Sequence, residues 1–433
     1  MLDSKRRSAA LDIALHVAVR ASDPRRIAEA LGAAGEQTRY PLSLRWEPHG
    51  IGSGDAGVAV LCGYVDACMP GEGWDRLAHD FVVSATEGAE RSNGLPPGLF
   101  SGLSGLAFAV ASLSRQGARY ARLLGALDDR LAPDALAVGA GLLPRDRPLE
   151  VSAFDVISGA SGVAAYLLLR DPHRVLPDML AGLVSLTDAS ERPPRWSTPP
   201  ELLDETMRRL YPWGNLNCGL AHGIPGPLAL LALALQTGHE VPGQAEAIRR
   251  VAEWLLAHSM DDEWGINWSS AVPLLRSGKP ANDNTSWRAA RSAWCYGSPG
   301  VARALWLAGE ALDDAFFRDR AVEAMLTVLH RPVAQRQIDS PTLCHGIAGL
   351  LLVLLRFAND TGIPAFAEAS GELVDQLIGI YDPDRPLGYA SLEPGGNSVD
   401  RAGLLDGAPG VAMALLAAAT DVEPTWDRLF LLS

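Results

Sequence analysis

Three side chains with the chemistry of zinc ligands stand beside two copies of one short motif. Cys295 lies two residues before the first glycine of GSPG, and Cys344 lies two residues before the first glycine of GIAG, with His345 between Cys344 and that glycine. Two thiolates and one imidazole are a typical Zn²⁺ ligand set, and three protein ligands leave a fourth tetrahedral position open, as in catalytic sites. The sequence therefore predicts one catalytic zinc ion, provided that the fold brings Cys295 close to Cys344.

Four further polar residues near the same kind of motif could move protons or stabilise charge. His222 and Tyr296 each directly precede the first glycine of a copy, Asp155 lies four residues before one, and Arg291 lies four residues before Cys295. A histidine suits proton transfer near neutral pH, a carboxylate can orient it, and an arginine can stabilise a developing negative charge. Ordinary surface or capping roles explain Asp155 and Arg291 equally well from spacing alone.

The motif is part of an internal repeat that accounts for much of the chain's glycine. Seven copies of Gly-x-x-Gly, each followed by a small or aliphatic run, begin at Gly54, Gly102, Gly159, Gly223, Gly297, Gly346 and Gly407. The mean period is about 59 residues, which is room for two helices and their loops. The segment after each copy is apolar all round and predicts a buried inner helix, whereas the intervening segments have the amphipathic pattern of outer helices.

Seven helical hairpins could form an open solenoid or a closed ring. An open solenoid is expected to have polar terminal repeats and a steady period, but here the terminal repeats keep the full motif and the spacing varies from 48 to 74 residues. We therefore predict an all-α, single-domain (α/α)7 toroid over residues 1–433. Its glycines would let the inner helices crowd together at one end and let backbone approach a central cavity. The longest interval predicts a loop or small non-helical insertion over residues 260–293.

Residues at the same offset from each motif should lie at the same height around a ring. Four of the seven residues directly before the first glycine are Ser or Asp, which commonly cap helices, and we expect capping at Ser53, Ser101, Ser158 and Asp406. The other three are His222, Tyr296 and His345, which are poor caps. Because Cys295 and Cys344 occupy equivalent positions of neighbouring repeats, we expect them to lie close together.

Composition excludes several other classes of function. The net charge of −14 has the wrong sign for binding nucleic acid or an anionic membrane surface, and no apolar run approaches the roughly 20 residues of a membrane-spanning helix. The first twenty residues predict an amphipathic helix rather than a signal peptide, so we expect a cytoplasmic protein. The five cysteines form no CxxC pair and argue against a disulfide framework, with Cys62 and Cys68 predicted in the core and Cys218 at the wrong offset for a ligand.

Through the segments AHGIPG, RSAWCYGSPG and LCHGIAG, and through all seven repeats, the chain resembles the LanC family of lanthionine synthetase cyclases. The resemblance implies a stand-alone class I lanthipeptide cyclase that adds the Cys thiols of a precursor peptide to its own dehydroalanine or dehydrobutyrine residues. It implies zinc ligation by Cys295, Cys344 and His345, acid or base roles for His222 and Asp155, and supporting roles for Arg291 and Tyr296. It also implies a dehydrated precursor peptide as partner and, in a biosynthetic complex at the membrane, the dehydratase and exporter of the same pathway.

Three other interpretations remain open at this stage. Eukaryotic LanC-like proteins are thought to add glutathione to dehydroamino acids in proteins, which keeps the zinc and changes the acceptor. Helical toroids also support carbohydrate and terpenoid chemistry. Such an enzyme would need paired acidic residues at its cavity, and Asp155 and Asp406 are the only candidates. A non-enzymatic, peptide-binding scaffold would not need stoichiometric zinc.

Overall fold

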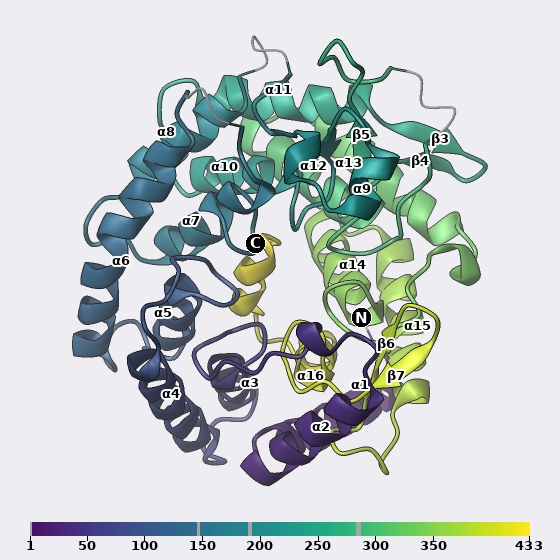
Figure 1. Ribbon diagram of the computed structural model, residues 1–433. Coiled ribbons are helices and arrows are strands. Elements are labelled where there is room, and N and C mark those ends of the chain that lie inside the picture. The colour runs from purple at the N-terminus through teal and green to yellow at the C-terminus, as the bar shows by residue number, and fades with distance from the viewer. Residues whose placement is uncertain (1, 145–147, 189–192, 283–286) are drawn as a thin grey trace. The chain divides into compact units, whose positions relative to one another are not determined.

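The computed structural model describes residues 2–144, 148–188, 193–282 and 287–433. The chain divides into two compact units. Unit 1 contains Met1–Pro96, Phe100–Gly125 and Gln337–Asp427, and unit 2 contains Pro97–Leu99, Ala126–Arg336 and Arg428–Ser433. Both units are mainly helical, and Figure 1 labels their elements.

Each predicted inner helix is present and buried on all sides. In unit 1 these helices are α3 (Asp55–Cys68), α5 (Leu103–Ser112), α14 (Ile347–Thr361) and α16 (Ala408–Ala419), and in unit 2 they are α7 (Ala160–Leu169), α10 (Pro225–Gln236) and α12 (Ser298–Leu312). Proline lies in the first turn of α10, α12 and α16, where the missing N–H has no intrahelical partner to lose.

The outer helices bury one face each. They are α1 (Ser4–Ala21), α2 (Pro24–Gln37), α4 (Trp74–Arg91) and α15 (Pro364–Ile380) in unit 1, and α8 (Leu176–Leu186), α11 (Gln244–Ala257) and α13 (Ala315–His330) in unit 2, with α6 at Ala121–Gly141. In α4 the buried residues include Trp74, Ala78, Phe81 and Ala85, which follow the helical period. The pairs α3 with α4, α7 with α8, α10 with α11, α12 with α13 and α14 with α15 pack together as the predicted hairpins.

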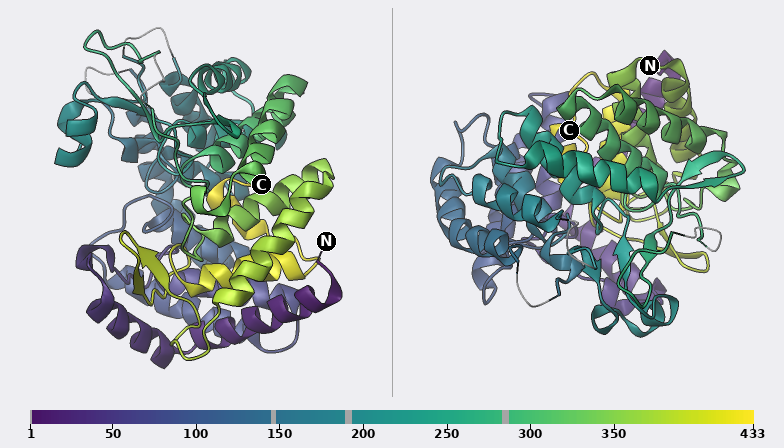
Figure 2. Two further views of the ribbon diagram at one scale, coloured as in Figure 1. Left: turned by 90° about the vertical axis from the view of Figure 1, so that its right-hand side faces the viewer. Right: turned by 90° about the horizontal axis from the view of Figure 1, so that it is seen from above.

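The last inner helix takes its outer partner from the other end of the sequence. Helix α16 packs against α1, and α2 lies beside strand β7 (Asn397–Val399). Figures 1 and 2 show these purple N-terminal helices beside the yellow segment of unit 1. The amphipathic first helix therefore completes the seventh hairpin. No helix among the described residues is long and apolar enough to span a membrane.

Short strands occupy the loops between repeats. In unit 2, β1 (Ser197–Thr198), β2 (Asn215–Asn217) and β5 (Ala271–Pro273) form an antiparallel sheet in the order β1-β2-β5, with Leu216 opposite Ser197 and Val272. Strands β3 (Met260–Asp262) and β4 (Gly265–Asn267) form a hairpin, as do β6 (Ser391–Glu393) and β7 in unit 1. Helix α9 (Glu205–Leu210) and the 3₁₀ helices complete the elements, the latter at Pro41–Ser43, Val151–Ala153, Pro200–Leu202, Val333–Gln335 and Thr425–Phe430.

The predicted insertion at residues 260–293 contains β3, β4 and β5, and its residues 283–286 lie outside the described residues. The sheet that contains β5 also includes β1 and β2, which precede the fourth motif copy and which no pattern in the sequence predicts.

Because the motif glycines lack a Cβ atom, the backbone of the loop before each helix can pack closely against them. A Cβ on Gly297 would overlap the carbonyl oxygen of Arg291, and a Cβ on Gly300 would overlap that of Trp294. The same six-residue relation recurs at several other motif copies, for example between Ser340 and Gly346 and between Leu404 and Gly410. The predicted reason, crowding between inner helices, is thus secondary to close packing of each loop on its own helix.

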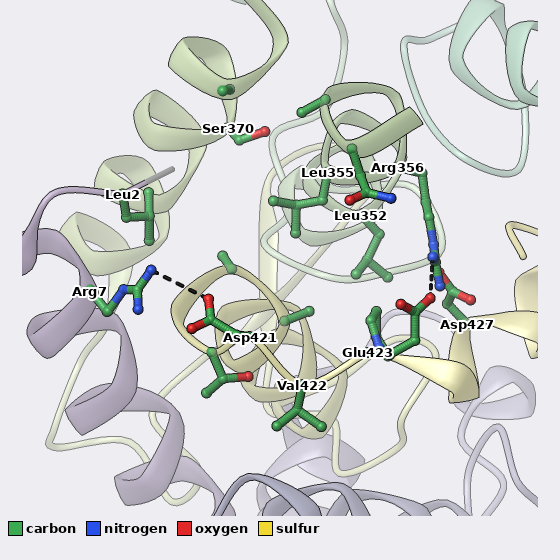
Figure 3. A pocket seen from close by; sticks show the side chains of 17 residues that line it. Leu2, Arg7, Leu352, Leu355, Arg356, Ser370, Asp421, Val422, Glu423 and Asp427 are labelled. Atoms are coloured by element: carbon green, nitrogen blue, oxygen red, sulfur yellow. Dashed lines mark hydrogen bonds and ion pairs between the residues drawn. The ribbon is translucent and has the colours of Figure 1, made fainter. Parts of the chain in front are cut away.

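A buried arginine fastens the segment after α16 to α14. Arg356 Nε donates to Asp427 Oδ2 at 2.5 Å and Nη1 donates to Glu423 Oε1 at 2.6 Å. These three side chains line one end of a cavity of about 510 Å³ whose apolar wall includes Leu352 and Val422 (Figure 3). Burial by itself would lower the pKa of Arg356, but the two carboxylates raise it above its usual value, so the guanidinium stays charged.

Candidate active site

Backbone hydrogen bonds join the loops at the inner-helix starts in unit 1. The Cys344 N–H donates to the Leu405 carbonyl at 3.1 Å, the Leu405 N–H donates to Gly52 at 3.1 Å, and the Gly52 N–H donates to Phe100 at 3.0 Å. All four residues stand two positions before a motif glycine. Within this unit, residues at the same offset from their motif glycines are therefore neighbours in space, as the alignment of the repeats predicts.

A similar series of backbone hydrogen bonds joins the loops at the inner-helix starts of unit 2. The Val156 N–H donates to the Ala221 carbonyl at 3.0 Å, and the Ala221 N–H donates to the Cys295 carbonyl at 3.4 Å. These bonds set the loop that carries His222 directly beside the loop that carries Cys295.

His222 and Asp155 form a hydrogen-bonded pair in unit 2. His222 Nδ1 lies 2.7 Å from Asp155 Oδ2, while Asp155 Oδ1 accepts the N–H groups of Ser158 and Gly159, each at 2.8 Å. The Asp155 side chain is 3% exposed and the His222 side chain is 40% exposed. The buried carboxylate is therefore fixed by backbone donors, and it orients an imidazole that solvent or a substrate can reach.

Tyr296 is held beside this pair by an asparagine. Asn217 Nδ2 donates to the Tyr296 hydroxyl at 3.0 Å, and Asn217 Oδ1 accepts the Gly219 N–H at 2.9 Å. The ring centroids of His222 and Tyr296 are 6.4 Å apart. The Tyr296 ring also lies where a Cβ on Gly219 would be, so this glycine makes room for it.

The Arg291 guanidinium is not brought into this arrangement. Arg291 is exposed, and no hydrogen bond or ion pair joins its side chain to any described residue. What its backbone contributes is the carbonyl that packs against Gly297.

In unit 1, Cys344 and His345 lie at the end of the loop that leads into α14. The His345 Nδ1 atom is 4.0 Å from Asp406 Oδ1, and these side chains are 31% and 33% exposed. The predicted capping at Asp406 is wrong, as it is at Ser53, Ser101 and Ser158. In each of these helices the motif glycine itself is the N-cap, so the residue before it stands one position too early, and no side chain makes a cap hydrogen bond.

Two of the three cysteines outside the predicted ligand set, Cys62 and Cys218, are buried thiols of the core. Burial raises the pKa of Cys62 and of Cys218 to about 12, which disfavours the thiolate form that binds metal. The predicted core position of Cys68 is wrong, because this last residue of α3 is only half-buried, beside Thr420. All five cysteines are free.

Cys295 in unit 2 and Cys344 and His345 in unit 1 are the predicted metal ligands, and each of these described residues offers one atom that could bind a metal ion. Two sulfur donors and one imidazole nitrogen suit zinc, whereas an all-oxygen set would suit calcium or magnesium. The chemistry of the donors is therefore compatible with zinc.

Two residues beside the candidate site were missed from the sequence as participants. Asn217, which holds Tyr296, stands six residues before Gly223, at the offset where Arg291 stands before Gly297. Asp406 shares the offset of His345, and the sequence predicts a helix cap there because aspartate commonly caps helices. The offset shared with a predicted metal ligand is the signal in the sequence that points to Asp406.

Paired inner and outer helices, with a His–Asp pair in unit 2 and candidate metal ligands at inner-helix starts of both units, define a helical-repeat protein. Residues 45–431 match the family model described as lanthionine synthetase C-like protein, and the chain belongs to this family. Among curated proteins, it is 26% identical over 310 residues to nisin biosynthesis protein NisC of Lactococcus lactis subsp. lactis, covering 67% of this chain and 70% of that protein.

Among solved structures, nisin cyclase is similar with a TM-score of 0.77 and 21% sequence identity, over 94% of this chain and 97% of that chain. This likeness shows the fold. It confirms the expected all-α class, an (α/α)7 toroid of helical hairpins.

Proposed function

We propose that this protein is a zinc-dependent peptide cyclase that forms thioether rings. In this proposal, Cys thiols of a dehydrated precursor peptide add to dehydroalanine or dehydrobutyrine residues of the same peptide, which gives lanthionine or methyllanthionine. The observation that carries the proposal is the His222–Asp155 pair in unit 2. The loop of His222 is hydrogen-bonded directly to the loop of Cys295, which is one of the three predicted zinc ligands. Family membership and the likeness to nisin cyclase support it.

Cys295, Cys344 and His345 would hold the zinc ion. With two thiolate ligands the charge of the ion is neutralised, so zinc at this position would keep a bound thiol deprotonated near neutral pH while leaving it nucleophilic. With its charge neutralised in this way, the zinc ion would be a weak activator of carbonyl groups. Thiol addition therefore suits the ligand set better than peptide hydrolysis.

The addition has a simple atomic balance. The thiol S–H bond breaks, a bond forms between sulfur and the β-carbon of the dehydro residue, and a proton is added at its α-carbon. Nothing leaves, so the peptide loses one free thiol per ring without changing mass.

His222 is the residue best suited to move these protons. Its Nδ1 faces Asp155 at 2.7 Å, which directs Nε2 away from that carboxylate and lets Asp155 stabilise the protonated imidazole. We propose that His222 delivers the proton to the α-carbon, with either His222 or solvent accepting the thiol proton. The Tyr296 hydroxyl, positioned by Asn217, would stabilise the enolate, and Arg291 would have to move toward the site to contribute.

The partner in this proposal is the dehydrated precursor peptide. The dehydratase and the exporter of the same pathway would be further partners of a cytoplasmic enzyme working at the membrane surface.

The test uses the zinc-loaded protein and a dehydrated peptide with free cysteines. Before alkylation, mass spectrometry should show that the peptide mass is unchanged by the reaction. After alkylation, it should show fewer modified thiols than in the peptide that was not treated with the enzyme. A parallel reaction with glutathione and a dehydrated peptide that lacks cysteine should show no increase in mass. Addition of glutathione without ring formation would instead support the glutathione-transferring alternative, and no reaction in either assay would overturn both.

A further inference from the structure

We propose that Asp406 is a positioning residue for His345: its carboxylate accepts a hydrogen bond from Nδ1–H and thereby presents Nε2 to the metal ion. This inference rests on the proposed zinc site. It gives Asp406, a residue of the seventh repeat, a role in the metal site, whereas the sequence pattern predicts a helix cap at this position.

The first observation is an unsatisfied oxygen atom. Asp406 Oδ1 is buried and has no hydrogen-bond partner among the described residues, and the same atom faces His345 Nδ1 at 4.0 Å. A buried carboxylate oxygen without a donor costs about 1 to 3 kcal/mol or more, so this position would be unfavourable without a nearby donor. The N–H of an imidazole that binds metal through its other nitrogen is such a donor.

The second observation is that the backbone already fixes the two residues relative to each other. The Cys344 N–H donates to the Leu405 carbonyl at 3.1 Å, and these are the residues directly before His345 and Asp406. The gap between the side chains exceeds a hydrogen bond by about 1 Å, which a small side-chain rotation closes without moving either helix.

The third observation excludes the competing role for Asp406. Helix α16 has Gly407 as its N-cap and no side-chain cap hydrogen bond, so the carboxylate is not used by the helix. Asp155, by contrast, does accept backbone N–H groups at the start of its inner helix, and it still turns its second oxygen toward His222. Each of these two histidines therefore has an aspartate facing its Nδ1 atom.

A carboxylate behind a metal-binding histidine selects the tautomer, restrains the ring and makes the ligand nitrogen more basic. Removing such a partner typically weakens metal binding by about 10- to 100-fold. Because the effect acts on the affinity for the ion, it can be measured without any peptide substrate.

The test compares zinc dissociation constants, measured by competition with a chromophoric chelator, for the parent protein and for Asp406→Ala, Asp406→Asn and Asp406→Glu. We expect Asp406→Ala to bind zinc about 10- to 100-fold more weakly, Asp406→Asn to lie between it and the parent, and Asp406→Glu to recover part of the loss. Asp384→Asn removes the same charge from an exposed position of unit 1 and should bind zinc like the parent. Melting temperatures of the zinc-free proteins should agree, which separates positioning from folding.

A second readout keeps the inference falsifiable if the variants fold poorly. Long-range proton–nitrogen correlation spectra of the zinc-loaded parent, with ¹⁵N-labelled histidine, should show His345 protonated at Nδ1 and metal-bound at Nε2. Metal at Nδ1, or zinc affinity of Asp406→Ala within twofold of the parent, would overturn this inference and leave the proposed function intact. A parent protein that binds no stoichiometric zinc would instead overturn the proposed function itself.

Discussion

Asp155 serves two different partners with its two oxygens. Oδ1 accepts two backbone N–H groups at the start of α7, and Oδ2 faces His222 Nδ1. Because the side chain is almost completely buried, neither partner can be replaced by bulk water without rearrangement. The residue thus links local loop structure to the orientation of the proposed proton carrier.

Replacing Asp155 with Asn separates these two tasks. An asparagine can still accept the backbone N–H groups, but its amide would donate to Nδ1 and favour the tautomer that is wrong for proton transfer. We expect the rate of thiol loss in a dehydrated peptide to fall by roughly 10²- to 10⁴-fold, with little change in melting temperature. A variant that cyclises at the parent rate would contradict the proposed role of the pair.

Asp155→Ala is the matched comparison for that experiment. It also removes the acceptor for the Ser158 and Gly159 N–H groups, so the free energy of unfolding should fall by about 1 to 3 kcal/mol. Chemical denaturation of both variants measures the difference. Equal stability of the two variants would show that the backbone contacts contribute little.

At the scale of the elements, the motif glycines are required by close packing rather than by helix propensity. A methyl group on Gly300 would overlap the Trp294 carbonyl, whereas a methyl group on Gly32, exposed within α2, would meet no atom within 4 Å. The two positions therefore respond to the same substitution in opposite ways.

We expect Gly300→Ala to destabilise the protein by about 1 to 3 kcal/mol, because the loop that carries Cys295 must move away from α12. Gly32→Ala should stabilise it by about 0.5 to 1 kcal/mol through the better helix propensity of alanine. Denaturant titration of the two variants beside the parent measures both effects. A neutral Gly300→Ala would show that this contact has room to relax.

The β6–β7 hairpin is tied to the loop after α2 by a buried glutamate. Glu393 accepts hydrogen bonds from the Thr38 hydroxyl at 2.5 Å, the Arg39 N–H at 3.0 Å and Arg401 Nη2 at 3.1 Å. Burial by itself would raise the pKa of Glu393, but hydrogen bonds from Thr38, Arg39, Asn397 and Arg401 outweigh it and lower the pKa from 4.5 to about 2.

The sign of the resulting pH dependence follows from that lowered pKa. A carboxyl that ionises more readily in the folded protein stabilises it above the unfolded value near 4.5, and this contribution is lost as pH falls toward 2. We therefore expect the stability difference between the parent and Glu393→Gln to shrink by on the order of 3 kcal/mol between pH 6 and pH 2. Unfolding titrations at several pH values measure it. A difference that does not change with pH would show that the ionised form is not favoured by these contacts.

At the scale of the whole molecule, the repeated motif was enough to predict the seven inner helices and most of their outer partners. Periodicity succeeds there because burial on all sides or on one side leaves a direct signature in the sequence. It could not show that α1 pairs with α16, since contacts between distant parts of the chain leave no local pattern. The sheet of β1, β2 and β5 was missed for a similar reason, because strands of two or three residues are too short to show alternation.

The candidate site could be predicted where its polar residues lie at fixed positions relative to the motif glycines. The His222–Asp155 contact and the neighbouring loops of His222 and Cys295 agree with the alignment of motif copies. Arg291 shows the limit of that reasoning, because spacing places a residue on a loop and does not determine where a long, exposed side chain points. Asn217 shows the other limit, since its role depends on a contact with Tyr296, 79 positions away in the sequence.

The measurement that tests the central claim most directly is the zinc content and cyclase activity of Cys344→Ala, with Cys68→Ala as control because both cysteines are half-buried in unit 1. The parent and Cys68→Ala should each bind one zinc ion per chain and consume the thiols of a dehydrated peptide without a change in mass. Cys344→Ala should lose both the zinc and the reaction. A Cys344→Ala protein that forms thioether rings without bound zinc would contradict the account.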